Sequence, residues 1–203
     1  MKNKNLLFLI IPVLCIAMIL GAFFFTKGTI KANESAKSNG VIEELFPDAT
    51  RYSEASYNKR FLALYLEENG YDTTDVVVDS VVYARNEQNA VQGLIVYMSC
   101  YKKYGGLIIM AVGIQSNGTI NGYVILDITD AKGLDSKVKE DDFKNQFIGK
   151  KVDYFTVSGE PRNESEVAAP NGAGDASGTV VNGVNAAILT LEFIDESMGG
   201  LLE

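Results

Sequence analysis

Small and hydroxyl-bearing residues are concentrated at residues 172–188, which makes this stretch the best candidate for chemistry in the chain. It begins Gly-Ala-Gly-Asp-Ala-Ser-Gly-Thr and passes into an apolar pattern typical of a helix. We expect a turn at residues 172–179, with free backbone N–H groups beside the hydroxyls of Ser177 and Thr179, an arrangement that suits a phosphate group. An ordinary helix N-cap, in which Ser177 or Thr179 caps a helix starting at Val180, explains the same residues.

The composition excludes several other kinds of site. The 203 residues contain no His and two Cys, so the Ser-His and Cys-His arrangements of hydrolases are absent. Cys15 lies in an apolar segment and Cys100 in a strand-like run, and their spacing predicts neither a disulfide nor a metal site. The net charge of −8 disfavours nucleic acid as a partner.

The N-terminus predicts a membrane anchor. Leu6 to Phe25 is uncharged and, at about 1.5 Å per residue, spans a hydrocarbon core of about 30 Å. We expect an anchor at residues 1–25, a polar linker at 26–40 and a folded domain at 41–203. A cleaved signal peptide is the alternative, although the bulky residues after Gly21 do not suit cleavage. Lys2 and Lys4 favour a single-pass protein with an extracytoplasmic domain.

The periodicity of the folded domain predicts an α+β class, with an antiparallel sheet and flanking helices. Helical spacing is found at Val41 to Phe46 and at Tyr57 to Asn69. Runs rich in Val, Ile and Tyr, joined by short turns, predict a meander of about four strands. These strands are expected at Val76 to Arg85, Val91 to Cys100, Gly106 to Ile114 and Ile120 to Ile128.

The remainder of the domain alternates between short elements. Asp141 to Ile148 predicts a short helix, whose two acidic residues at the start favour the helix dipole. Val152 to Val157 predicts a further strand, and Ser158 to Gly174 a surface loop. Val180 to Ile194 predicts the last helix.

The segment from Tyr104 to Ile125 carries a resemblance to a known family. Here a Tyr-Gly pair opens a strand, Gly118 turns a hairpin, and Ile120 and Gly122 start the return strand. Together with Asp130-Ala-Lys-Gly-Leu and the later pattern from Asp142 to Lys150, it resembles the membrane-anchored FMN-binding subunits of two complexes. These are the G-type subunit of Rnf electron-transport complexes and the C-type subunit of sodium-translocating NADH:quinone reductase.

The resemblance implies a covalently bound cofactor. In that family a Ser-Gly-Ala-Thr-x-Thr-Ser motif carries FMN as a phosphoester on its Thr hydroxyl. With one residue deleted, Ser177, Gly178 and Thr179 match this motif and Thr179 is the flavin-bearing residue. Without the gap, Gly178 takes the acceptor position, and Val180 and Val181 replace the later hydroxyls. Flavin bound covalently at Thr179, FMN bound without the covalent bond, and loss of flavin therefore all remain open.

Two further residues are candidates for the flavin site through the same resemblance. Asp130 stands where the family writes Glu near the flavin, although a lone Asp at a strand end commonly accepts a turn hydrogen bond. Tyr104 is a candidate to line the site, although a Tyr that opens a strand is commonly a half-buried packing residue.

The resemblance implies a membrane-anchored, extracytoplasmic subunit that carries FMN and transfers electrons within an ion-translocating oxidoreductase complex. Its implied partners are other integral membrane subunits and a flavin transferase, and it is not expected to be a complete enzyme by itself. The alternative is a structural or sensing module that keeps the fold but holds no flavin. Val180 and Val181 favour that alternative, since hydroxyls are expected at their positions in one register.

Overall fold

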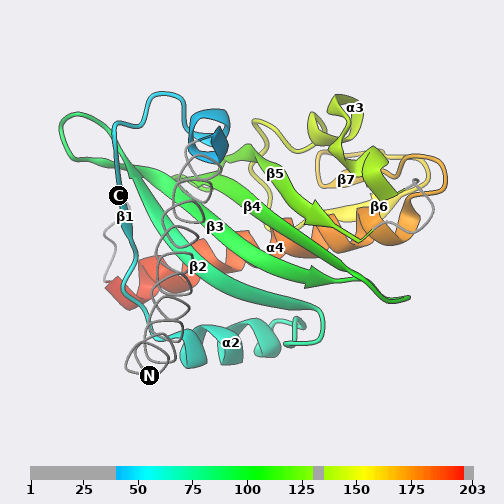
Figure 1. The fold of residues 1–203 in the computed structure, drawn as a ribbon, viewed down its shortest axis with the longest axis horizontal. Helices are drawn as coiled ribbons and strands as arrows, with labels where there is room; N and C mark the ends of the chain where they lie inside the picture. The colour runs from blue at the N-terminus through cyan, green and yellow to red at the C-terminus, as the bar shows by residue number, and fades with distance from the viewer. Residues whose placement is uncertain (1–39, 130–134, 199–203) are drawn as a thin grey trace, which may run out of the picture. The chain divides into compact units, whose positions relative to one another are not determined.

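A five-stranded antiparallel sheet forms the centre of the domain in a computed structural model that describes residues 40–129 and 135–198 (Figure 1). The strand order follows the sequence from β1 to β5, so each strand pairs with its neighbours along the chain. The strands are β1 (Arg51–Glu54), β2 (Val76–Arg85), β3 (Val91–Tyr101), β4 (Leu107–Gln115) and β5 (Ile120–Ile128). The predicted meander is confirmed, with β1 as an additional strand at its edge.

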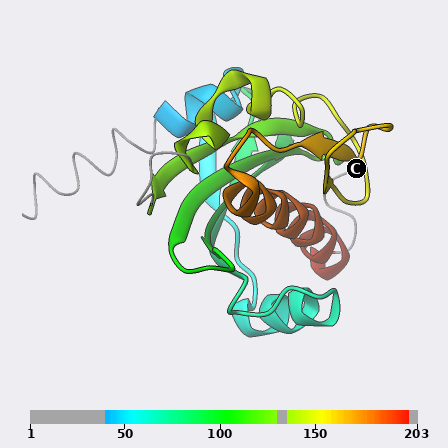
Figure 2. The ribbon, with the colours of Figure 1, turned by 90° about the vertical axis from the view of Figure 1, so that its right-hand side faces the viewer.

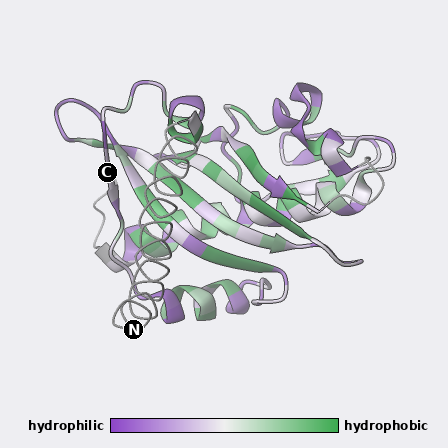
Figure 3. Cartoon of the chain, viewed as in Figure 1, coloured by the Kyte–Doolittle hydropathy of each residue, from purple (hydrophilic) through white to green (hydrophobic). Residues whose placement is uncertain are grey.

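The last helix, α4 (Gly174–Met198), supplies the core on one face of the sheet. Figure 2 shows the sheet curving around this helix. Strand residues with alternating burial, such as Met98 and Met110, contact Gly183 and its neighbours on α4. Almost every α4 residue from Ala176 to Leu191 is buried, in keeping with the apolar colouring of the helix in Figure 3.

A smaller core covers the other face of the sheet. Residues 40–45 are helical, and Val41, Ile42, Leu45 and Phe46 pack on Ala84, Ile95 and Ala111. Small residues on the strands let this helix approach closely: a Cβ added to Gly93 would lie 2.8 Å from the Phe46 ring. The sheet is therefore covered on both faces, and the predicted α+β class is confirmed.

The helix α2 (Lys59–Glu68) packs beside α4 and β2. Its N-cap is Asn58, whose side-chain oxygen accepts hydrogen bonds from the N–H groups of Arg60 and Phe61 at 3.0 and 3.3 Å. Leu62 and Leu66 are buried one turn apart, and Tyr65 contacts Phe193 of α4 with ring centroids 5.6 Å apart and the rings tilted by 48°. This packing fixes the residues that follow α2, including Tyr71.

The part of the sequence between β5 and α4 is held against the core by aromatic packing. It contains a 3-10 helix η1 (Asp135–Lys139), the short helix α3 (Asp141–Lys144), and two strands, β6 (Thr156–Ser158) and β7 (Glu166–Ala168), which pair in parallel. Phe147 contacts Tyr123, Phe143 and Phe155 with ring centroids 5.0 to 5.5 Å apart. These rings anchor the backbone at residues 153–157 against the core.

Several boundaries differ from the sequence expectations. The helix predicted at Asp141 to Ile148 is only α3, which ends at Lys144. The strand predicted at Val152 to Val157 is only β6, and the loop predicted at Ser158 to Gly174 contains β7. The last helix begins at Gly174, six residues before the predicted start, so the turn expected at residues 172–179 is wrong beyond Ala173. Burial explains this last difference, because Ala173, Ala176 and Ser177 pack into the core and draw the first turns of α4 onto it.

Within residues 40–129 and 135–198, α4 is long and apolar enough to cross a bilayer, over Gly174–Ser197, but 72% of its most apolar stretch is buried inside the domain. It is therefore the core helix described above. The anchor predicted at residues 1–25 and most of the predicted linker lie outside the described residues.

Candidate functional site

A cavity of about 530 Å³ lies along one side of α4 and is the best candidate for a ligand site. Its size falls within the usual range for small-molecule sites, roughly 300 to 1,000 Å³. We call it the α4 cavity. Its lining comes from three parts of the chain: the loop after α2, residues 153–157, which lead into β6, and one side of α4. The lining residues are Asn69, Tyr71, Asp153, Tyr154, Phe155, Thr156, Val157, Gly178, Val181, Asn182, Asn185 and Leu189.

Asn185 joins the three parts of this lining. Its Oδ1 accepts a hydrogen bond from the Phe155 N–H at 2.7 Å, and its Nδ2 donates to the Phe155 carbonyl at 2.9 Å. The same Nδ2 donates to the Tyr71 hydroxyl at 3.0 Å. A buried amide with all of these bonds satisfied is a rigid clamp, so the walls of the cavity are held in fixed positions.

Polar and aromatic groups in the lining are available to a ligand. Within the described part of the chain, the side chains of Asp153, Tyr154, Thr156 and Asn182 make no hydrogen bond to protein. Tyr154 is 59% exposed. Aromatic surface with a few uncommitted polar groups is the composition expected for binding a flat heteroaromatic ring.

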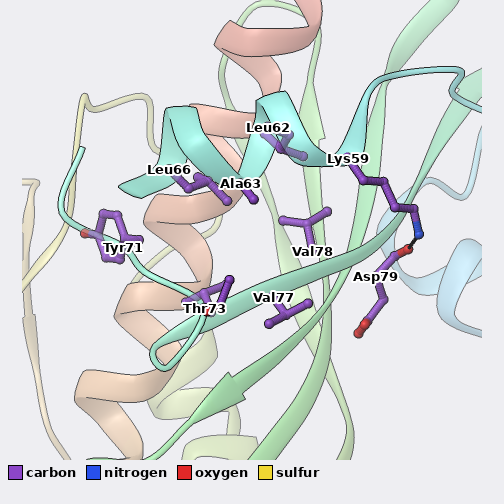
Figure 4. Close-up of a pocket in the computed structure, with 10 residues that line it drawn as sticks. Lys59, Leu62, Ala63, Leu66, Tyr71, Thr73, Val77, Val78 and Asp79 are labelled. Atoms are coloured by element: carbon purple, nitrogen blue, oxygen red, sulfur yellow. Dashed lines mark hydrogen bonds between the residues drawn. The ribbon is translucent and has the colours of Figure 1, made fainter. Parts of the chain in front are cut away.

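A second, smaller cavity shares Tyr71 with the α4 cavity. It has a volume of about 210 Å³ and lies between α2 and β2, with Leu62, Leu66 and Val78 in its lining (Figure 4). The Lys59 ammonium donates to the Asp79 carbonyl at one end of it. Its volume is below the usual range for a cofactor site. Tyr71 therefore lines both cavities, and the larger one is the better candidate.

The predicted site residues of α4 have different surroundings. Ser177 is fully buried, and its hydroxyl donates to the Ala173 carbonyl at 2.8 Å. Thr179 is 4% exposed, and its hydroxyl donates to the Asp175 carbonyl at 2.9 Å. Both side chains bond back into the helix, so the helix N-cap expected for them is wrong. Gly178 is partly exposed and lines the α4 cavity.

Tyr104, the predicted aromatic residue, is not brought to this cavity. Tyr104 is 81% exposed in the turn between β3 and β4, where the Lys103 ammonium lies 5.7 Å from its ring centroid. It is neither a half-buried packing residue nor part of the cavity lining. Asp130 lies outside the described residues. The acidic pair at Asp141 and Asp142 occupies the first turn of α3, as expected.

Sequence reasoning missed Tyr71, Phe155 and Asn185. These residues are far apart along the chain, and only the packing of α2, β6 and α4 brings them together. A signal for Asn185 was present, because it is a polar residue within the apolar pattern of the last helix. Such a residue is commonly placed to satisfy another buried polar group.

Comparison with known proteins gives one extended sequence match. No protein-family model matches the chain. The chain is 24% identical over 193 residues to the G-type subunit of the proton-translocating ferredoxin:NAD(+) oxidoreductase complex of Clostridium ljungdahlii, and the match covers 92% of each protein. A solved structure, NqrC of Shewanella oneidensis, aligns with a TM-score of 0.49 and 14% identity over 76% of this chain and 73% of that chain. The resemblance to G-type subunits expected from the sequence is thereby confirmed.

Proposed function

We propose that this chain is an electron-transfer subunit of an ion-translocating oxidoreductase complex in a membrane, and that it holds FMN in the α4 cavity. The alignment with the G-type subunit of the clostridial complex, along 92% of both proteins, is the observation that carries the proposal. An alignment of this extent spans nearly the whole chain. The function of the relative is thus a reasonable guide to this chain as a whole.

The lining of the α4 cavity suits the ring of a flavin. Tyr154 offers an exposed aromatic face, and Asn182 and Thr156 offer uncommitted hydrogen-bonding groups for the edge of a ring. The clamp made by Asn185 keeps these walls in place before a ligand binds, which lowers the entropic cost of binding. When bound, a flavin supplies reversible electron transfer, and the protein sets its potential through hydrogen bonds and charge.

The lining suits the phosphate of FMN less well. It contains the carboxylate of Asp153 and no Lys or Arg, so a phosphate dianion has no cation in the wall itself. Lys150 is close by, since its ammonium lies 5.9 Å from the centroid of the Phe155 ring. The ring is therefore expected to contribute most of the binding free energy, and the phosphate comparatively little.

The membrane location belongs to the same proposal. An anchor at residues 1–25 would hold the domain beside the integral membrane subunits of the complex, on the extracytoplasmic side. A flavin transferase is a partner only if the cofactor is attached covalently. The subunit does not perform a complete reaction by itself, because the electron donor and acceptor belong to other subunits.

The proposal is tested with the full chain, purified from membranes in a mild detergent. We expect FMN to lose fluorescence on titration with the protein, and polytopic membrane proteins to co-purify and be identified by mass spectrometry. Asn182→Leu should weaken FMN binding, whereas Asn145→Leu, at an exposed position outside the cavity lining, should leave it unchanged. Absence of FMN binding together with isolation of the chain alone would contradict the proposal.

A flavin-free structural or sensing module is the second candidate. In the ungapped register of the motif, Gly178, Val180 and Val181 stand where hydroxyl residues are expected, which favours this candidate. The carboxylate of Asp153 in the cavity lining favours it as well. The same experiment distinguishes the two, because this module would co-purify with membrane partners without binding FMN.

A further inference from the structure

The side of α4 that faces the cavity is centred on Gly178. Successive residues of an α-helix are rotated by about 100° around its axis. The five α4 residues in the lining follow the spacing i, i+3, i+4, i+7 and i+11, which places them on one side of the helix: Gly178, Val181, Asn182, Asn185 and Leu189. Gly178 is near the middle of this side, so a side chain at position 178 would point into the cavity.

The two hydroxyl residues beside Gly178 point elsewhere. Ser177 and Thr179 are each rotated by about 100° from Gly178, in opposite directions, and neither lines the cavity. Both side chains are buried, and both hydroxyls donate to carbonyls four residues earlier in the chain. A phosphoester at Thr179 would remove the proton that makes its hydrogen bond and would place a charged group where the side chain is 4% exposed. The surroundings of Thr179 therefore do not fit a covalently attached flavin phosphate.

Gly178 offers open space instead. A Cβ added at this position would meet no atom within 4 Å. With no side chain, the backbone of α4 is exposed to the cavity, and a flat ring can approach it closely. Tyr154 and the Asn185 clamp belong to the same lining, so a ring can lie on the Gly178 surface without any bond to α4.

We infer, building on the proposed function, that this chain holds its flavin by non-covalent contacts alone, with the ring lying against Gly178. Residues 177–179, which match the motif, lie within α4, and the residue among them that faces the cavity is Gly178, which has no hydroxyl. The cofactor is consequently exchangeable, and its occupancy depends on the concentration of free flavin.

The test uses the full chain, coexpressed with a flavin transferase and then analysed under denaturing conditions. We expect the mass of the unmodified polypeptide and no fluorescent band on a denaturing gel. After removal of flavin, the native protein should bind FMN in a fluorescence titration, and Thr179→Val should bind it within about twofold of the parent affinity.

Variants at position 178 test where the ring lies. Gly178→Leu should weaken FMN binding at least tenfold, because its side chain fills the space against which the ring lies. Gly178→Ala is the matched control for folding, since its Cβ meets nothing, and it should keep the far-ultraviolet circular dichroism of the parent. If Gly178→Leu keeps the same dichroism and binds FMN as tightly as the parent, the assigned position of the ring is wrong.

Two outcomes separate this inference from the proposed function. A parent chain that carries an FMN mass increment, which Thr179→Val removes, would overturn the inference and leave the flavin function intact. A parent chain that neither carries the increment nor binds added FMN would overturn the flavin function and the inference together.

Discussion

Gly178 and Gly183 lie on the same helix, five residues apart, and have opposite surroundings. A Cβ at Gly178 would meet nothing within 4 Å, whereas one at Gly183 would lie 2.7 Å from the Met110 sulfur, 2.9 Å from the Cys100 sulfur and 3.2 Å from the Met98 sulfur. The first glycine faces a cavity, and the second lets α4 pack directly on the sheet. One side of α4 therefore leaves space for a ligand, and the other packs tightly against the sheet.

The largest expected loss of stability comes from a substitution on the cavity side of α4. It tests whether Asn185 holds the wall of the cavity in place. Asn185→Leu leaves the N–H and carbonyl of Phe155 without their partners in a buried position. We expect a loss of about 3 kcal/mol in the free energy of unfolding, since each unsatisfied buried group costs about 1 to 3 kcal/mol. Urea unfolding of the full chain, followed by circular dichroism, measures this loss. A loss below about 1 kcal/mol would show that Asn185 does not clamp the wall.

Gly183→Ala tests the packed side directly. Its methyl group would overlap three buried sulfur-containing side chains, and overpacking of this kind costs about 1 to 3 kcal/mol. The higher helix propensity of Ala returns about 1 kcal/mol, so we expect a net destabilisation of about 1 kcal/mol in the same unfolding assay. An increase in stability would mean that the sulfur atoms move aside at little cost.

The Cys100 thiol gives the packed side a pH dependence. Burial, with a smaller contribution from the negative charge of Asp79, raises its pKa to about 12. The unfolded thiol ionises first, near pH 9, so the stabilisation is complete below that pH and is lost as the pH rises toward 12. Between pH 8 and pH 9.5 we expect the free energy of unfolding to fall by about 1 kcal/mol. Cys100→Ala should remove this dependence, and an equal slope in that variant would assign it to other groups.

Gly178→Ala has the smallest expected effect, and its sign is opposite to that of Gly183→Ala. The methyl group enters open space, and Ala is favoured over Gly inside a helix by about 0.5 to 1 kcal/mol. The variant should therefore unfold at a slightly higher urea concentration than the parent. Equal changes at positions 178 and 183 would remove the difference between the two sides of α4.

The strands whose own residues strongly favour β-structure could be predicted from the sequence. The bounds of β2 and β5 agree with prediction because β-branched residues dominate both strands. The strand β1 could not be predicted, since all four of its residues are exposed and it is ordered by pairing with β2. The early start of α4 was missed for a similar reason. Its first residues resemble a turn in composition, but burial of Ala173, Ala176 and Ser177 makes them helical.

The candidate site could be predicted only in part. The sequence indicated the correct end of the correct helix, at residues 177–179, because small residues beside hydroxyls are unusual there. It could not show which of the three residues faces a cavity, since that depends on the position of the first helical turn. The other walls come from Tyr71 and Phe155, whose approach to α4 depends on tertiary packing. Tyr104 was a poor candidate because its turn extends away from the core.

Because α4 follows the sheet in the sequence, the sheet is synthesised before the helix that covers it. The strands β2 to β5 pair with their neighbours in sequence and can form hairpins as they emerge. Their apolar concave face stays uncovered until α4 arrives, and no shorter chain has the third wall of the cavity. A premature stop before residue 174 would therefore leave the apolar face of the sheet exposed. Such a chain is expected to aggregate or be degraded by proteases, and not to form a folded domain with an empty cavity. Any ligand of the α4 cavity can therefore bind only after residues 174–198 have been synthesised.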